Sequence, residues 1–317
     1  MPELPEVEVV RRGLAGHLLG SRIQAVQVKD GRSVRRHEAG PVEFERLLTG
    51  LTISDVARRG KYLWLLFEGV EEFALVIHLG MSGQVLLKHP DLPDEKHLKI
   101  RCVLDGATDE AGQVSPLEMR FVDQRIFGGM FTSSLVPVTG ADGKELPGAG
   151  ASVLNLPVIP KAVAHIARDP LDPYFDFSSF RKKMLATGTG IKKMLLDQSV
   201  ISGVGNIYAD EALWRARLHY AKPARSIAAW QARELVEAAT HVMRDALAQG
   251  GTSFDALYVN VNGESGYFDR SLQAYGQAGR PCPRCLTAGR SSLIVREPFG
   301  GRSSFRCPHC QRKPRGL

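Results

Sequence analysis

A potential nucleophile stands at the start of the chain, next to two carboxylates. Pro2 follows Met1, and removal of Met1 would leave Pro2 with a free secondary amine. An α-amino group has a pKa of about 7.7–8.0, against about 10.4 for a lysine side chain, so it is far more often neutral and nucleophilic at pH 7. Its attack on an aldehyde carbon gives an iminium ion, which stays cationic and accepts electrons. Glu3 and Glu6, within one helical turn, could then move protons.

A structural interpretation of the same stretch is also open. The prolines at positions 2 and 5 would fix φ at the start of a helix, where Glu3 and Glu6 would be favourable near the positive end of the helix dipole. For six residues taken alone, this structural interpretation is the commoner one. The rest of the chain has to decide between them.

Four cysteines near the end of the chain have the spacing of a metal site. Cys282 and Cys285 form one CxxC pair, and Cys307 and Cys310 form a second pair 21 residues later. This pattern is typical of zinc, and four thiolates complete a tetrahedron without an open position, so we expect one structural Zn²⁺. The fifth cysteine, Cys102, lies in an apolar strand-like run, and we expect it in the core.

Positive charge is concentrated in the same part of the chain. The net charge is +7, and residues 276–317 contain one acid, Glu297, and nine basic residues. The basic residues are Arg280, Arg284, Arg290, Arg296, Arg302, Arg306, Arg312, Lys313 and Arg315. A basic tail on a nearly neutral body indicates a polyanionic partner, although small basic ribbons also occur in ribosomal and metabolic proteins.

The composition is that of a globular protein with 44% hydrophobic and 24% charged residues. A length of 317 residues allows two or three small domains. The chain has no run of 18 apolar residues and no N-terminal signal pattern, so we expect a protein that is neither secreted nor embedded in a membrane. Four of the five cysteines lie in two CxxC pairs and the fifth lies apart, which favours a metal site in a reducing compartment over a disulfide framework.

Three stretches in the first half combine cations, glycines and apolar side chains. Arg58 and Arg59 precede Lys61 in a turn before a strand, and a strand through His78 runs into a glycine-rich turn that exposes a methionine at position 81. Further on, positions 125 and 127 place an arginine and a phenylalanine on one side of an extended segment. Each has an ordinary interpretation: a solvated hairpin tip, a satisfied histidine, or core filling by methionine.

A stretch in the second half is typical of a phosphate site. Residues 192–211 predict a helix, a glycine-marked turn and a second helix capped by Asn206. A capping asparagine and the free N–H groups of a helix start can bind an anion. An ordinary helix–turn–helix corner packed in a core would give the same spacing.

The elements around these residues predict an α+β protein of several domains. We expect an N-terminal helix over 5–19, an antiparallel β-sandwich up to about residue 130, and mainly helices after a proline-marked connection. The expected strands are 23–28, 62–67, 73–79, 85–87 and 100–104, with a hairpin of 293–295 and 303–305 around Gly300-Gly301. The expected later helices are 177–187, 190–198, 206–218 and 228–249. Residues 105–116 and 138–151 resemble surface insertions.

These motifs, in this order, resemble the formamidopyrimidine-DNA glycosylase and endonuclease VIII family. The resemblance covers the N-terminal Pro-Glu pair, the Arg-Gly-Lys-Tyr turn, His-Leu-Gly-Met-Ser-Gly, Asp-Gln-Arg-Ile-Phe-Gly, the stretch 192–211 and the cysteine pairs. It implies a catalytic domain over 1–150, a linker over 151–175, a helix–two-turn–helix domain with a lesion-recognition loop over 176–275, and a zinc finger over 276–317. It also implies a monomeric bacterial protein of the cytoplasm and nucleoid, with oxidised double-stranded DNA as partner.

The resemblance also implies roles for single residues. Pro2, Glu3, Glu6 and Lys61 would form the catalytic group, with Lys61 also at a phosphate. The DNA-binding residues would be His78, Met81, Arg125, Phe127, Asn206 and Arg302. Of these, His78, Asn206 and Arg302 would contact the backbone, whereas the other three would fill the gap left by an everted base, with Arg125 facing the orphaned partner base. Gln124 and Ile126 depart from the family pattern, where proline and arginine are commoner, and this bears on opposite-base specificity.

The function implied is that of a bifunctional glycosylase and lyase for oxidised purines. Pro2 would attack C1′ of an everted nucleotide and β,δ-elimination would nick the strand, with Glu3 relaying protons and Glu6 supporting it. An endonuclease VIII-type enzyme for oxidised pyrimidines is the alternative enzyme, although Leu4 and Met81 favour the purine branch. A non-catalytic protein that binds damaged DNA is the alternative of another class.

Overall fold

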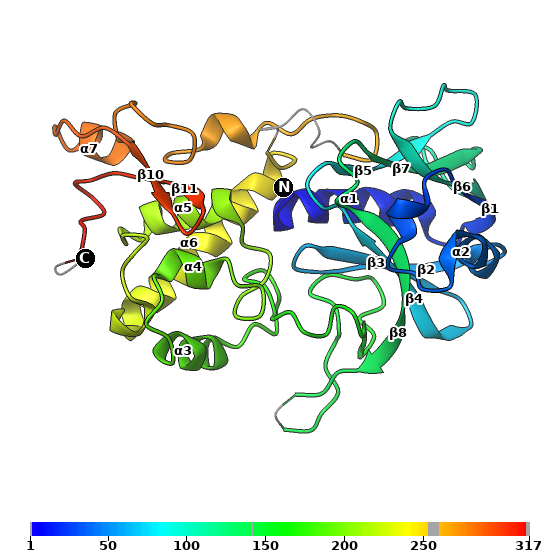
Figure 1. The fold of residues 1–317 in the computed structure, drawn as a ribbon, viewed down its shortest axis with the longest axis horizontal. Coiled ribbons are helices and arrows are strands. Elements are labelled where there is room, and N and C mark those ends of the chain that lie inside the picture. The colour runs from blue at the N-terminus through cyan, green and yellow to red at the C-terminus, as the bar shows by residue number, and fades with distance from the viewer. Residues whose placement is uncertain (1, 141, 253–259, 315–317) are drawn as a thin grey trace. The chain divides into compact units, whose positions relative to one another are not determined.

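The computed structural model describes residues 2–140, 142–252 and 260–314. These residues form two compact units (Figure 1), of which the first contains Met1–His165 and Gly250–Gly266 and the second contains Ile166–Gln249 and Tyr267–Leu317. The chain therefore returns once to the first unit before it ends in the second. The finer division into four segments stays a prediction.

Two antiparallel sheets form the body of the first unit, which confirms the expected sandwich. One sheet has the strand order β1-β6-β7-β5 and the other has β2-β3-β4-β8-β9. The bounds are Arg22–Val28 (β1), Ile53–Arg59 (β2), Tyr62–Phe67 (β3), Val70–His78 (β4), Gly83–Lys88 (β5), Leu98–Asp105 (β6), Leu117–Asp123 (β7), Gly129–Pro137 (β8) and Val158–Pro160 (β9). Two-residue turns join β2 to β3 and β3 to β4, as antiparallel pairing allows, whereas the pairs β1–β6, β7–β5 and β4–β8 bring together strands that are not consecutive in the chain.

One hydrophobic core joins both sheets to the helix α1 (Leu4–Leu18). Val10 and Leu14 of α1, Leu65 of β3 and Phe121 of β7 are all buried in it. Burial of each large apolar side chain contributes roughly 1.5–3 kcal/mol, so the helix is held along its length. The helix expected over 5–19 is confirmed to within one residue at each end.

The helix α2 (Gly40–Leu48) was not predicted. Of its nine residues, only Phe44 and Leu48 are buried. The stretch has four apolar residues, Val42, Phe44, Leu47 and Leu48, within nine positions, and a pattern this short does not reveal helical periodicity. A 3₁₀ turn at Gly31–Val34 precedes it.

Helices dominate the second unit, as expected. They are α3 (Phe177–Leu185), α4 (Ile191–Leu195), α5 (Asn206–Arg215), α6 (Ala229–Ala248) and the short α7 (Pro283–Thr287). Leu213 of α5 and Leu235 of α6 are buried where these two helices pack. In the part of the chain that the structure describes, no helix is both long and apolar enough to cross a bilayer.

The strands β10 (Val295–Phe299) and β11 (Arg302–Arg306) form a hairpin near the C-terminus. Gly300 and Gly301 have φ values of 57° and 75°, which a two-residue turn of this kind requires. The turn pairs Phe299 with Arg302, so the first strand has to run up to it. The expected first strand, 293–295, was therefore wrong, whereas the second, 303–305, is confirmed.

Candidate active site and nucleic-acid interface

The residues that surround Pro2 are held inside the first unit. Pro2 is buried, and Glu3 and Glu6 are 3% and 7% exposed. The Glu3 backbone N–H, at the cap position of α1, donates to Glu6 Oε2 at 2.9 Å. The other oxygen, Oε1, accepts the N–H of Thr252 at 2.9 Å and its hydroxyl at 3.0 Å. The structure thus brings the Glu6 carboxylate to the peptide that follows Pro2.

A buried ion network fastens α1 to β2 two residues further along. Arg58 Nε donates to Glu8 Oε2 at 2.9 Å, and Arg11 and Arg12 bind the same carboxylate. Burial raises the pKa of Glu8, but the hydrogen bonds and charges of Arg11 and Arg58 outweigh it, and the pKa is lowered to about 2. The sequence interpretation of Arg58 as part of a solvated turn was wrong, because this residue belongs to β2 and is buried against Glu8.

Lys61 and His78 lie at the same end of neighbouring strands. Lys61 is in the two-residue turn between β2 and β3, and His78 ends β4 opposite Tyr62, with ring centroids 4.7 Å apart. Burial lowers the pKa of His78 to about 4, and the charges of Arg36 and Lys61 act in the same direction. His78 is therefore neutral at pH 7, so it can donate one ring N–H without carrying charge.

Met81 and Phe127 project from two adjacent turns of the first unit. They are 39% and 55% exposed, and Arg125 is exposed as well. The turns pack backbone against backbone, since a Cβ on Gly80 would lie 2.4 Å from the nitrogen of Gly128. These exposed side chains therefore stand on a closely packed base.

A buried carboxylate organises the second of these turns. Asp123 Oδ1 accepts the Ser82 hydroxyl at 2.5 Å and the Arg125 N–H at 3.0 Å. Asp123 Oδ2 accepts the Gly128 N–H at 2.8 Å. One side chain thus ties both turns together and fixes the backbone on each side of Phe127.

Arg35 holds the same turn from outside, a contact that the sequence did not indicate. Its guanidinium donates to the carbonyl oxygens of Ile126 at 3.1 Å and Phe127 at 3.3 Å. Ile126 has a φ of 56°, in the left-handed region that a β-branched residue rarely adopts. The position that departs from the family pattern is therefore also a strained one, and it needs such contacts to persist.

In the second unit, Asn206 is the first residue of α5 and does not cap it, which corrects the expected role. Gly205 occupies the cap position, and no side chain caps the helix there. Asn206 Nδ2 instead donates to the carbonyl oxygen of Ser303 in β11 at 3.1 Å. The hairpin backbone thus replaces the helix start as the partner of this amide.

A buried lysine joins the same hairpin to two helices. Lys192 of α4 is fully buried, and its Nζ donates to Asp210 Oδ1 at 2.7 Å and to the Ser303 carbonyl oxygen at 2.9 Å. Asp210 Oδ2 accepts the backbone N–H of Phe305 at 3.0 Å. Burial raises the pKa of Asp210, while the charge of Lys192 opposes that shift. One ion pair thereby fixes β11 against α4 and α5.

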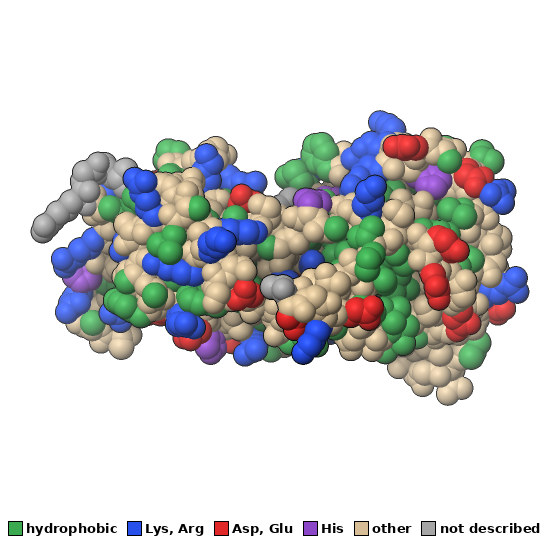
Figure 2. Space-filling model, turned by 90° about the horizontal axis from the view of Figure 1, so that it is seen from below, with side chains coloured by type: hydrophobic (Ala, Val, Ile, Leu, Met, Phe, Trp, Pro, Cys, Tyr) green, Lys and Arg blue, Asp and Glu red, His purple; other side chains and the backbone are tan. Residues whose placement is uncertain are grey.

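Arg302 begins β11 directly after the glycine turn, and it is exposed. The one acid of the basic tail, Glu297, accepts Arg306 Nε at 2.6 Å and the Tyr220 hydroxyl at 2.8 Å. Lys and Arg side chains are spread over the face of the second unit seen in Figure 2. The hairpin therefore presents a basic side chain at its turn while its acid is engaged nearer its base.

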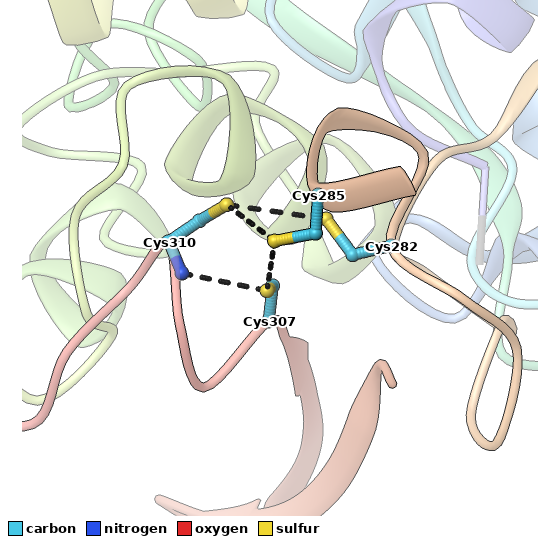
Figure 3. A group of neighbouring side chains, drawn as sticks. All are labelled: Cys282, Cys285, Cys307 and Cys310. Atoms are coloured by element: carbon cyan, nitrogen blue, oxygen red, sulfur yellow. Dashed lines mark hydrogen bonds between the residues drawn. The ribbon is translucent and has the colours of Figure 1, made fainter. Parts of the chain in front are cut away.

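The four cysteines converge at the base of the hairpin (Figure 3). Their Sγ atoms all lie within 4.8 Å of one another, with 3.5 Å between Cys285 and Cys310 and 3.6 Å between Cys285 and Cys307. A tetrahedron with Zn–S bonds of about 2.3 Å has S–S edges of about 3.8 Å, so the donor set fits zinc. The Trp214 indole N–H also donates to Cys282 Sγ at 3.4 Å.

Comparison with known proteins identifies the family. A model of the formamidopyrimidine-DNA glycosylase N-terminal domain matches residues 1–130, and a model of the formamidopyrimidine-DNA glycosylase H2TH domain matches residues 166–256. The chain belongs to the formamidopyrimidine-DNA glycosylase family. The formamidopyrimidine-DNA glycosylase of Rhodococcus jostii (strain RHA1) is 54% identical over 315 residues, which cover 99% of this chain and 97% of that protein.

Solved structures of the formamidopyrimidine-DNA glycosylase family share the fold. The Lactococcus lactis protein in complex with abasic-site DNA has a TM-score of 0.76 at 29% identity, covering 98% of this chain and all of that one. A structure of MutM with DNA containing carbocyclic 8-oxo-G has a TM-score of 0.77 at 30% identity and the same coverage of this chain. Both similarities extend over both units.

The sequence indicated candidate residues for the site but not several residues that hydrogen-bond to them. In the first unit, Thr252 and Arg35 were not named. The pair of glycines before Thr252 was a usable signal, because it predicts close approach of the backbone to another element. Residues 253–259, in the region 176–275 that was expected to contain the lesion-recognition loop, lie outside the described residues.

Proposed function

We propose that this chain is a bifunctional DNA glycosylase and apurinic/apyrimidinic lyase that removes 8-oxoguanine and formamidopyrimidines from duplex DNA in base excision repair. The observation that carries the proposal is the buried Pro2-Glu3 pair at the start of α1, in which the Glu3 N–H donates to the Glu6 carboxylate. The DNA bound in the related structures, abasic or with an 8-oxoguanine analogue, supports this substrate class. The relatives are bacterial, so the enzyme would act on DNA of the bacterial nucleoid. We propose that it does so as a monomer.

Pro2 would be the nucleophile once Met1 is removed. Its nitrogen lone pair attacks C1′ of the everted nucleotide, the C1′–N9 bond breaks, and the base leaves with that electron pair and takes up a proton. The amine loses its proton, Glu3 donates one to O4′, and the C1′–O4′ bond breaks as the iminium forms. Loss of a C2′ proton then expels the 3′ phosphate, and a second elimination expels the 5′ phosphate.

Side chains of the first unit would hold the distorted duplex. Lys61 and the neutral His78 would bind phosphates, one by charge and the other by an N–H donor. Met81 and Phe127 would fill the space vacated by the everted nucleotide, since exposed apolar side chains on a rigid base can act as wedges. Arg125 would face the orphaned base.

The second unit would bind the DNA backbone through Asn206 and Arg302. The contacts of Asn206 and Lys192 with Ser303 support this, because they fix the hairpin from which Arg302 projects. We propose Zn²⁺ as the ion held by Cys282, Cys285, Cys307 and Cys310. Since four thiolates fill its coordination sphere, zinc would stabilise the hairpin and take no part in the chemistry.

Borohydride trapping on a duplex with 8-oxoguanine opposite cytosine tests the proposed activity. The protein with a free Pro2 amine should form a covalent adduct, whereas a preparation that retains Met1 should not. Pro2→Gly, which keeps a primary amine, should trap more slowly. Normal trapping by the Met1-retaining protein would contradict the assignment and make Lys61 the next candidate.

The same assay separates the alternative functions. A duplex with an oxidised pyrimidine should be cut more slowly than the 8-oxoguanine duplex. The reverse order would favour an endonuclease VIII-type enzyme. Binding of both duplexes without any adduct would favour a non-catalytic damage-binding protein.

A further inference from the structure

The segment Gly250-Gly251-Thr252 lies against the start of α1, 246 residues away in the sequence from Glu6. Thr252 is 1% exposed, and both its N–H and its hydroxyl donate to Glu6 Oε1, at 2.9 Å and 3.0 Å. Glu6 Oε2 accepts the Glu3 N–H at 2.9 Å. Both oxygens of this buried carboxylate thus accept hydrogen bonds, and the residues that donate them, Glu3 and Thr252, come from distant parts of the chain.

The backbone around Thr252 is shaped for this close approach. Gly251 has a φ of 86°, and a Cβ there would lie 3.3 Å from Glu6 Oε1 and 3.7 Å from its Cα. A Cβ on Gly266 would lie 2.3 Å from the carbonyl oxygen of Gly251 and 2.4 Å from that of Gly250. Side chains at these positions would push Thr252 away from α1, so the glycines are needed for its two hydrogen bonds.

A second attachment to α1 lies further along the chain, at Val261. Val261 is buried, and a Cβ on Gly13 of α1 would lie 2.6 Å from its side chain. The Leu87 N–H donates to the Val261 carbonyl oxygen at 2.8 Å, and Lys88 Nζ donates to the Asn262 carbonyl oxygen at 3.0 Å. The described parts of 250–266 therefore contact α1 at its first turn and again near its middle.

We propose that Thr252 is a positioning residue for the excision reaction, an inference that rests on the proposed function. Its hydroxyl and N–H fix Glu6 so that Oε2 holds the Glu3 N–H, and this fixes the peptide that carries the Pro2 amine. Loss of the Thr252 hydroxyl takes one hydrogen bond from this buried carboxylate and so weakens the control of its orientation. Small displacements of a nucleophile slow attack strongly, by as much as about a hundredfold per ångström.

The test compares Thr252→Val with Thr252→Ser in the full-length, metal-loaded protein. Val keeps the size and the backbone N–H but lacks the hydroxyl, whereas Ser keeps the hydroxyl. With saturating 8-oxoguanine duplex, we expect the single-turnover excision rate of Thr252→Val to fall by roughly tenfold, the equivalent of one charge-assisted hydrogen bond. KM should stay within about twofold, and Thr252→Ser should recover most of the rate. Borohydride trapping on preformed abasic-site duplex should slow in parallel.

Thr49→Val is the matched control, because Thr49 donates its hydroxyl to the Glu45 carbonyl oxygen on α2, outside the site. It should excise at the wild-type rate. A Thr252→Val protein with the wild-type rate, or with only a raised KM, would overturn the positioning role. If that variant does not fold, Thr252→Ala removes the same hydroxyl and is judged by the same criteria. Absence of trapping by the wild-type protein would instead refute the proposed function.

Discussion

The start of α1 and the β10–β11 hairpin are both proposed to meet DNA, yet they are fixed by different means. α1 lies in a core that includes both sheets of the first unit, with Leu14 and Phe121 among its fully buried residues. The hairpin rests on a small cluster that contains Trp214, Phe305 and three of the cysteines. Little apolar surface is available there, so a metal and a buried ion pair have to supply the stability that the hydrophobic core supplies to α1.

The two regions also use buried ion pairs differently. Glu8, which fastens α1, receives Arg11, Arg12 and Arg58. Lys192, beside the hairpin, pairs with Asp210 and donates to a backbone and a hydroxyl oxygen of β11. Several cations lower the pKa of one carboxylate, whereas burial raises that of the other. The carboxylate at α1 therefore binds several cations and keeps others when one is lost, whereas the carboxylate at the hairpin is bound by Lys192.

Removal of the metal should have the largest effect, and this effect should fall on the hairpin. Structural zinc contributes roughly 10–16 kcal/mol in small zinc-binding peptides, more than the cluster around Trp214 can replace. Cys307→Ser should therefore lose zinc, unfold the hairpin and abolish binding to lesion duplex, as measured by metal content and fluorescence anisotropy. Cys102→Ala is the control, since Cys102 is buried in β6 and should leave metal and binding intact. A zinc-free protein that binds at wild-type affinity would contradict this prediction.

Truncation of one cation in each ion pair should have the next largest effect. Arg58→Met and Lys192→Met each take a cation from a buried carboxylate, at a cost of roughly 3–5 kcal/mol. Lys192→Met should be the more severe in urea unfolding, because Glu8 keeps two other arginines. Lys144→Met, on a side chain that is 82% exposed, should change stability by no more than about 0.5 kcal/mol. A larger loss of stability from Arg58→Met than from Lys192→Met would mean that the number of cations around each carboxylate does not explain the difference between the two regions.

Residue types and local spacing were sufficient to predict the carboxylates near Pro2, the cysteine cluster and most elements. Periodicity is a local property, so α1 and α6 were expected within a residue or so of their bounds. The cysteine spacing constrains metal geometry directly, and the thiols do converge. These features need no knowledge of what packs against them.

Other features depended on tertiary partners and could not be predicted. The sequence places Arg58 at the surface, and only the fold brings it to Glu8. The sequence likewise predicts that Asn206 caps a helix, and only the fold places the Ser303 carbonyl oxygen beside its side chain. The left-handed φ of Ile126 contradicts its local preference and exists because surrounding contacts impose it. Thr252 and Glu6 are 246 residues apart in the sequence, too far for any motif to connect them.

Acid should weaken the ion pairs through which Glu8 holds α1 against β2. The pKa of this carboxyl falls from 4.5 to about 2 on folding, so its stabilisation is complete above the unfolded value and is lost as the pH falls from about 5 towards 2. At 1.36 kcal/mol per pKa unit, the shift corresponds to about 3 kcal/mol at pH 7. The stability gap between wild type and Glu8→Gln in urea should therefore shrink by about 2 kcal/mol between pH 7 and pH 3. A gap that is unchanged with pH would exclude a lowered pKa.

The smallest expected effect concerns the exposed end of the hairpin. The backbone of β11 is fixed by Lys192 and Asn206 at Ser303, so Arg302→Ala should keep the metal, the fold and the unfolding midpoint. The loss of charge-assisted hydrogen bonds to phosphate should weaken duplex binding by roughly 1–3 kcal/mol. It should also reduce the slope of log affinity against log salt by about one unit, equally for intact and lesion DNA. Arg46→Ala is the control. Arg46 is an exposed residue of α2, so this substitution removes the same charge at a position far from the hairpin in the sequence, and it should change neither the affinity nor the salt slope. Equal effects of the two variants would show that net charge, and not the hairpin, governs binding.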